Sequence, residues 1–222
     1  TCRLALFSNF AFNDFIICLG YKGNYIKDWF NDYFLHHNDV VFDLGKNKVE
    51  FLKKRGENWK VTLVDTGDQT MTGGRFKRIR PYLDNKTFMA TYGDGVGDIN
   101  LKKLLKFHKS HGKLATLTSV VPEGRFGAIT INNRKQITNF NEKKDNKDPV
   151  NAGFFILEPA VMDYIDGDES IFEQEPLRNL SKDKQLMAFH HEGFWKPMDT
   201  LNDKNTLEKI WATGSAPWKV WK

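Results

Sequence analysis

Residues 87–95, Thr-Phe-Met-Ala-Thr-Tyr-Gly-Asp-Gly, decide the fold class of this chain. The first part of the run is apolar and β-prone and predicts a buried strand, and the glycines on either side of Asp94 predict a sharp turn at its end. Downstream, Asp98 is a candidate cap for a helix over 99–111, and another strand is expected at 114–121. Strand, turn, helix and strand in this order are typical of an α/β sheet, which binds ligands beyond the carboxyl ends of its strands.

The alternation of strands and helices continues on both sides of this stretch. The apolar run 15–20 predicts a strand buried on both faces, and the apolar spacing over 24–36 is helical. Other strands are expected within 39–63 and at 126–132, 137–141, 153–157 and 187–190, and other helices at 74–82, 158–166, 170–181 and after Thr200. No repeat or linker divides the chain. We therefore expect a single α/β domain over 1–222, Rossmann-like, with a mixed, mostly parallel sheet flanked by helices.

The composition excludes several classes of function. Lys plus Arg number 33 and Asp plus Glu 28, a net charge of +5, and the absence of a basic block argues against a nucleic-acid partner. No apolar stretch approaches the roughly 18 residues that cross a bilayer, so we expect no membrane partner. Cys2 and Cys18 form neither a disulfide framework nor a metal-ligand pattern, which favours a cytoplasmic location. The small positive excess suits an anionic substrate such as a phosphate ester.

Asp94 is the first candidate for chemistry, because it follows the carboxyl end of a strand. A carboxylate there suits Mg²⁺, which takes one or two carboxylates and leaves its other positions to phosphates and water. A carboxylate that only shapes the turn is the alternative. Asp199, within 195–200, is a candidate second metal ligand or the cap of the final helix.

The loop 66–75 is a candidate site for a phosphate or a base. Its small residues precede a helix and leave backbone N–H groups accessible, and Arg75 and Arg78 can neutralise phosphate charge. An ordinary flexible loop has the same composition. Lys143 is a candidate phosphate clamp, although its lysine-rich surroundings also suit a solvated run of charge.

A set of short motifs extends from about residue 12 to the C-terminus. They lie at 11–23, 65–67, 71–75, 92–96, 125–128, 140–143, 151–155, 175–177, 193–200 and 216–219. Each motif is common by itself, but the combination resembles the sugar nucleotidyltransferase family, and within it the glucose-1-phosphate cytidylyltransferases.

The resemblance implies a reaction in which CTP and α-D-glucose 1-phosphate give CDP-glucose and pyrophosphate, for the dideoxysugars of bacterial surface polysaccharide such as O-antigen. It implies that Asp94 and Asp199 hold Mg²⁺, and it implies catalytic roles for Arg75 and Lys143. The other implied contacts are to the nucleotide, from Met71, Thr72, Gly73 and Arg75, and to the sugar phosphate and its cleft, from Tyr92, Gly93, Lys143, Asn151 and Gly153.

Two features depart from the pattern of the family. Ala152 stands where a second glycine is usual. The first βα unit of the family, with its Gly-x-Gly-Thr-Arg loop and Pro-Lys-Pro segment, has no counterpart, so we expect this chain to lack it. The alternative function is therefore a catalytically inactive, truncated remnant that binds sugar nucleotide or pairs with an intact paralogue.

Two other questions stay open on the sequence. A nucleotide-sugar glycosyltransferase also combines an α/β cleft with a carboxylate-bound metal, although the stretch 94–98 is not a compact Asp-x-Asp. The aromatic tail, with Trp211, Trp218 and Trp221, suits either the interface of a homo-oligomer or core packing.

Overall fold

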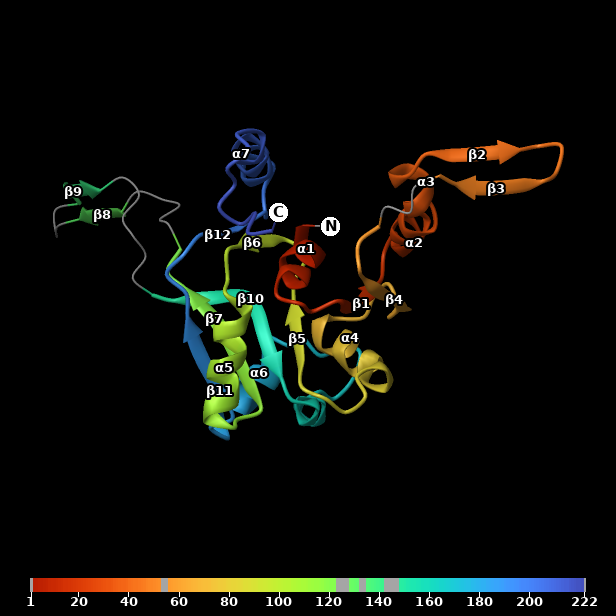
Figure 1. Cartoon of the computed structure of the whole chain (residues 1–222). Helices are drawn as coiled ribbons and strands as arrows, with labels where there is room; N and C mark the ends of the chain where they lie inside the picture. The colour runs from red at the N-terminus through yellow and green to blue at the C-terminus, as the bar shows by residue number, and fades with distance from the viewer. Residues whose placement is uncertain (1, 53–55, 123–127, 132–134, 142–147, 222) are drawn as a thin grey trace.

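A four-stranded mixed sheet with the order β11-β7-β10-β5 forms the centre of the protein (Figure 1). The computed structural model describes residues 2–52, 56–122, 128–131, 135–141 and 148–221. The strands of the sheet are β5 (Phe88–Thr91), β7 (Ala115–Val120), β10 (Val150–Leu157) and β11 (Leu186–His190). β10 runs antiparallel to β5 and β7, whereas β11 runs parallel to β7. The predicted mixed α/β sheet is confirmed, with antiparallel pairing at its centre.

Helices cover both faces of this sheet. Along β10, Phe155 and Leu157 pack against η2 (Pro159–Tyr164) and α6 (Glu175–Lys182). The alternate residues Phe154 and Ile156 pack against α1 (Cys2–Asn9) and α5 (Leu101–His111). Successive side chains of a strand point to opposite faces, so a continuous apolar run fits a strand that is buried on both sides. Each fully buried Phe stabilises the fold by about 2 to 3 kcal/mol relative to an exposed one.

A second, parallel pair is formed by β1 (Asp14–Leu19) and β4 (Lys60–Asp65). Their carboxyl ends are level, since Leu19 lies opposite Asp65. The strand expected at 15–20 is therefore present, but the expectation that both of its faces are buried is wrong. Of the residues of β1, only Leu19 is fully buried.

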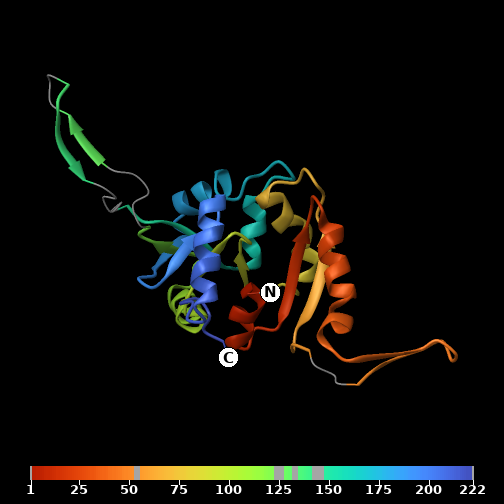
Figure 2. The same ribbon diagram turned by 90° about the horizontal axis from the view of Figure 1, so that it is seen from above.

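A hairpin arm projects from the body beside this pair. The single helix expected over 24–36 is two, α2 (Gly23–Asn31) and α3 (Tyr33–His37), with a break at Asp32. They lead to the hairpin of β2 (Val40–Asp43) and β3 (Lys48–Phe51), which Figures 1 and 2 show reaching away from the sheet. A hairpin of β8 (Ala128–Ile131) and β9 (Ile137–Asn141) projects on the opposite side.

Short elements complete the edge where the strands β5 and β7 end. β6 (Gly95–Gly97) pairs with β12 (Trp195–Pro197), and α7 (Leu201–Ala212) follows. The cap of α5 is Asn100, whose side chain accepts the amide of Lys103, so the expectation that Asp98 caps this helix is wrong. Asp98 instead pairs with His191 at 3.0 Å. Among the helices described, none has the length and apolar character that crossing a bilayer demands.

The aromatic tail is part core and part surface. Trp218 is 5% exposed and packs with Leu207 and Phe194, whereas Trp211 is 44% exposed. The core-packing interpretation therefore holds for Trp218, and the exposed Trp211 ring stacks on it.

Candidate active site

Asp94 lies opposite Met198, the residue before Asp199, at the carboxyl edge of the sheet. Asp94 follows β5, and its carbonyl oxygen accepts a hydrogen bond from the amide of Met198 at 2.6 Å. This bond continues the ladder between β6 and β12, in which Gly95 lies opposite Pro197. Both aspartates are exposed. The segments that carry Asp94 and Asp199 are far apart in the sequence and adjoin in the fold, and a metal ion shared by the two aspartates stays a prediction.

The cap alternative for Asp199 is wrong. The N-cap of α7 is Thr200, whose hydroxyl oxygen accepts the amide of Asp203 at 3.1 Å, and Asp203 returns the contact in a capping box. The described residues contain no group of three or more His, Cys, Asp or Glu that could hold a metal. Exposed carboxylates on two adjoining segments are still ligands of the kind that Mg²⁺ takes, because this ion takes its other ligands from phosphates and water.

Arg3 is a residue of this edge that the sequence did not point to. Its guanidinium donates to the Thr91 hydroxyl at 2.8 Å and lies over the Phe154 ring, 4.5 Å from the centroid. Burial lowers the pKa of Arg3 to about 10, and the Asp94 carboxylate acts in the opposite direction. Arg3 therefore stays protonated at neutral pH and places a positive charge near Asp94. The one available signal was a lone charge within the apolar helix α1.

Tyr92, Asn151 and Gly153 form the neighbouring part of the site. The Tyr92 amide donates to the Gly153 carbonyl at 3.2 Å, and the Gly153 amide donates to the Asn151 side chain at 2.9 Å. Gly153 has φ +72°, and a Cβ there would lie 2.8 Å from the Tyr92 ring. Only glycine fits this left-handed bulge without strain. A Cβ on Gly93 would meet no atom within 4 Å.

The departure at Ala152 leaves the bulge intact. Ala152 is 4% exposed, and its carbonyl accepts the indole N–H of Trp195 at 2.9 Å. The extra methyl group is therefore accommodated inside the protein, and the backbone ties β10 to β12.

The second group of candidates surrounds the start of α4 (Thr72–Ile79). Free backbone N–H groups were expected here, and for three residues this expectation is wrong. The amide of Met71 donates to the Asp168 carbonyl at 2.8 Å, and the amides of Gly73 and Gly74 donate to the Ser170 carbonyl at 2.8 and 3.3 Å.

The physical reason is the close approach of residues 168–170. A Cβ on Gly74 would lie 2.5 Å from the Asp168 Cα, and one on Gly73 would lie 2.7 Å from the Ser170 carbonyl oxygen. The paired glycines thus serve the packing of two backbones. Thr72 is engaged in the same way, since its hydroxyl donates to Glu173 at 2.7 Å.

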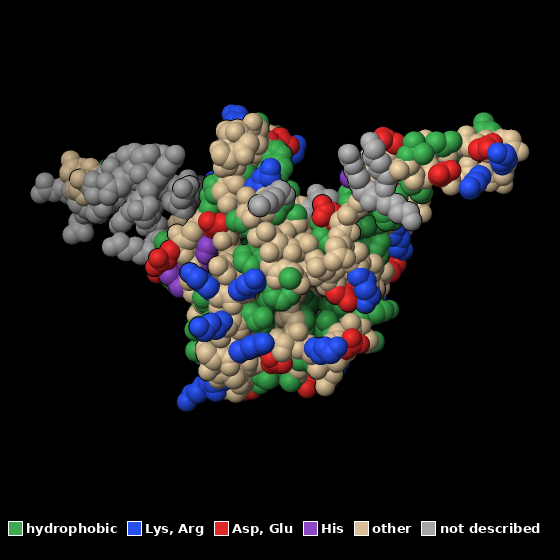
Figure 3. All heavy atoms as spheres, viewed as in Figure 1, with side chains coloured by type: hydrophobic (Ala, Val, Ile, Leu, Met, Phe, Trp, Pro, Cys, Tyr) green, Lys and Arg blue, Asp and Glu red, His purple; other side chains and the backbone are tan. Residues whose placement is uncertain are grey.

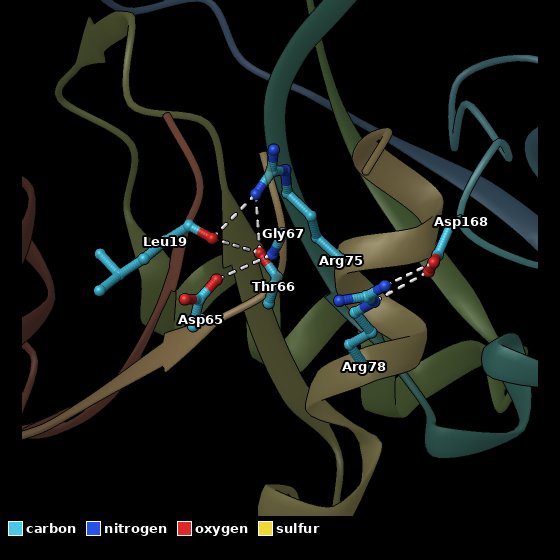
Figure 4. A network of polar contacts seen from close by, with 7 residues as sticks. All are labelled: Leu19, Asp65, Thr66, Gly67, Arg75, Arg78 and Asp168. Carbon is cyan, nitrogen blue, oxygen red and sulfur yellow. Dashed lines mark hydrogen bonds and ion pairs between the residues drawn. The ribbon is translucent and has the colours of Figure 1, made fainter. Parts of the chain in front are cut away.

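The two arginines expected at phosphate both bind protein groups (Figure 4). Arg75 Nη1 donates to the Leu19 carbonyl at 3.0 Å and to the Thr66 hydroxyl at 2.7 Å. Arg78 forms a two-point ion pair with Asp168, through Nε at 2.9 Å and Nη2 at 2.5 Å. Hydrogen bonding to Arg78 lowers the pKa of Asp168, and the same bond raises the pKa of Arg78. Lys143 lies outside the described residues.

Comparison with known protein families supplies the class of reaction. A family model described as Nucleotidyl transferase matches residues 41–205. The chain belongs to the nucleotidyl transferase family. This nucleotidyl transferase is 52% identical to the glucose-1-phosphate cytidylyltransferase of Salmonella typhimurium, over 99% of this chain and 86% of that protein. It is 39% identical to the probable glucose-1-phosphate cytidylyltransferase of Bacillus subtilis, over 98% of this chain and 85% of that protein.

The fold of this nucleotidyl transferase is also found in solved structures. HddC from Yersinia pseudotuberculosis matches with a TM-score of 0.63 at 20% identity, over 95% of this chain and 84% of that one. The family and fold that the sequence motifs predicted are thus confirmed.

Proposed function

We propose that this nucleotidyl transferase joins CTP and α-D-glucose 1-phosphate into CDP-glucose and releases pyrophosphate. The observation that carries the proposal is the backbone hydrogen bond between Asp94 and Met198. It places the segments that carry Asp94 and Asp199 at one sheet edge, in a chain whose relatives are named as glucose-1-phosphate cytidylyltransferases. We place the reaction in the cytoplasm and its product in the synthesis of surface polysaccharide.

The reaction asks mainly for positioning and charge neutralisation. A phosphate oxygen of the sugar phosphate attacks the α-phosphorus of CTP, a new P–O bond forms, and the bond to the bridging oxygen breaks with its electron pair leaving on pyrophosphate. Asp94 and Asp199 would hold Mg²⁺, which when bound supplies positive charge at the α-phosphate. Arg3 adds a fixed positive charge near the same edge.

The remaining residues hold the sugar phosphate. Tyr92, Asn151 and Gly153 form a rigid wall, since the bulge at Gly153 is fixed by hydrogen bonds to both of the others. The nucleotide is assigned to the loop before α4, where Met71 is 42% exposed although its amide is bound. A rigid wall on the sugar side and a loop with a bound backbone on the nucleotide side lower the entropic cost of bringing the two substrates together.

The test of this function is the choice of nucleotide. With Mg²⁺ and glucose 1-phosphate, we expect release of pyrophosphate from CTP with a kcat/KM about tenfold or more above that with UTP or dTTP. Pyrophosphate release is followed in a coupled assay. Equal activity with the three nucleotides would contradict the cytidylyl assignment. Binding of CDP-glucose in calorimetry without turnover would instead support the inactive remnant.

We also propose that the chain self-associates through the hairpin face, the side of the β2–β3 hairpin that carries Val40, Phe42, Val49 and Phe51. Cross-strand partners share a face, and the pairs here are Val40 with Phe51 and Phe42 with Val49. Phe42 is 58% exposed and Val49 49%. A lone two-stranded hairpin is at best marginally stable in water, so an uncovered apolar face favours a second copy as its cover. Figure 3 shows apolar side chains along this arm.

Lysine on the hairpin face should dissociate the oligomer. For the double variant Phe42→Lys, Val49→Lys, we expect light scattering after size exclusion to give the monomer mass, because a charge in an apolar interface is costly to bury. Val41→Lys is the matched control, since Val41 is 44% exposed on the other face of the same hairpin. A wild-type chain that is already monomeric at micromolar concentration would rule out the proposal.

A further inference from the structure

We propose that Arg75 and Arg78 are positioning residues that hold the loop 66–71 in one conformation, and that this loop sets the affinity for the nucleotide. The inference rests on the proposed function. The loop begins where β4 ends, at the level carboxyl ends of the parallel pair β1–β4. Ligands of α/β sheets bind beyond such ends.

The first anchor lies at the start of the loop. Thr66 is fully buried, and its hydroxyl and amide both donate to the Leu19 carbonyl, at 2.7 and 2.9 Å. Arg75 donates to the same carbonyl and to the Thr66 hydroxyl, and its second nitrogen approaches the Asp68 carbonyl at 3.4 Å. One guanidinium thus joins the ends of β1 and β4 to the loop (Figure 4).

The space around Arg75 is fitted to this arrangement. A Cβ on Gly20 would lie 2.6 Å from both terminal nitrogens of the guanidinium. The planar fork of Arg meets several oxygens at fixed angles, which a lysine ammonium cannot reproduce. The guanidinium is therefore part of the scaffold under the loop.

The second anchor lies at the end of the loop. The side chain of Asp168 binds Arg78, and its backbone carbonyl accepts the amide of Met71, the last residue of the loop. Gly74 permits this contact, because any side chain there would meet the backbone of Asp168. The ion pair with Arg78 consequently holds Asp168 in place, and the Asp168 carbonyl in turn holds the end of the loop at Met71.

One helix carries both anchors. Arg75 and Arg78 are three residues apart on α4, so their side chains leave neighbouring positions of one rigid element. Between the anchors, Thr70 is buried and Gln69 and Met71 are exposed. The exposed side chains can meet a ligand on a backbone that needs no further ordering, and such preorganisation raises affinity.

The ion pair Arg80–Asp163 is a matched control. It links the same helical region to the chain before residue 168 at 2.9 Å, with side chains 49% and 63% exposed, against 43% and 47% for Arg78–Asp168. It makes no contact with the loop in the interactions described. For Asp168→Asn we expect the KM for CTP to rise about fivefold to tenfold, with kcat and the KM for glucose 1-phosphate within about twofold. Asp163→Asn should leave all three within about twofold.

The exchanged pair Arg78→Asp, Asp168→Arg should recover part of the lost affinity for CTP. A fall in kcat with no change in KM would overturn the inference, because it would indicate a direct role in the reaction. Equal effects of the Asp168 and Asp163 substitutions would also overturn it.

Hydrogen exchange separates this inference from the proposed function. In Asp168→Asn, the amide of Met71 should exchange at least about tenfold faster than in the wild-type chain, because its acceptor is no longer held. Asp163→Asn should leave its exchange rate unchanged. This readout needs no turnover, so an inactive wild-type chain would refute the proposed function alone. Unchanged exchange at Met71 in Asp168→Asn would refute the anchors alone.

Discussion

Asparagine at position 94 should lower kcat for CDP-glucose formation by about a thousandfold, the scale seen when an electrostatic contact to the reacting group is removed. Asn keeps the size of the side chain but removes the negative charge that would hold Mg²⁺. The backbone bond from Met198 to the carbonyl of residue 94 is independent of the side chain, so the fold should persist. The measurement is kcat at saturating Mg²⁺ and substrates, together with the melting temperature.

The control for this prediction is Asp163→Asn, which removes an exposed carboxylate bound to Arg80. Asp199→Asn should resemble Asp94→Asn, and the double variant should be little worse than either single one, because residues that serve one ion act as a unit. If the losses of kcat in the two single variants multiply in the double variant, this would argue against a shared metal at this edge. Retained activity in Asp94→Asn would argue against it as well.

Of the variants considered, Gly74→Ala should lower the free energy of unfolding most. Its Cβ would lie 2.5 Å from the Asp168 Cα and 2.7 Å from the Asp168 carbonyl oxygen, and a backbone cannot move aside as a flexible side chain can. We expect a loss of about 3 kcal/mol, the upper range for overpacking. In a chain of this size that loss corresponds to a fall of about 6 to 12 °C in Tm.

Gly167→Ala is the control for Gly74→Ala. Gly167 belongs to the segment that packs on α4, but a Cβ there would meet no atom within 4 Å. Its Tm should stay within about 2 °C of the wild-type value. The same small change in Gly74→Ala would show that residues 168–170 can move away from α4 at little cost.

The helices and strands that could be predicted well are those whose own residues show an apolar run or a helical spacing. β5 and β10 are apolar runs and α5 has helical spacing, so each was located to within a few residues. β6 and β12 were missed, because Gly95–Gly97 and Trp195–Pro197 have no strand pattern and become strands only by pairing with each other. The split at Asp32 was missed for a similar reason, since the apolar spacing continues across it.

The residues of the candidate site also fall into those that the local sequence indicates and those that depend on partners distant in the sequence. Asp94 follows a recognisable strand, so its place at the sheet edge could be predicted, whereas Asp199 reaches that edge through β12, which has no strand pattern of its own. The pair Gly73-Gly74 was ambiguous, because glycine signals accessible amides as well as close packing. The deciding partner is Ser170, which is distant in the sequence. Arg3 was missed because the groups it meets, Thr91 and Phe154, also come from later in the chain.

The position of β10 has a consequence for synthesis on the ribosome. β10 lies between β5 and β7, yet both of these strands are translated before it. A nascent chain that has not reached Val150 therefore presents two strands whose common neighbour has not been made, and the facing edges offer unpaired N–H and C=O groups. Translation through Leu157 supplies the missing strand and joins them. β10 thus joins β5 to β7 in one step, before β11 is added beside β7, and the interval before that step is when the emerging chain is most exposed to wrong pairing.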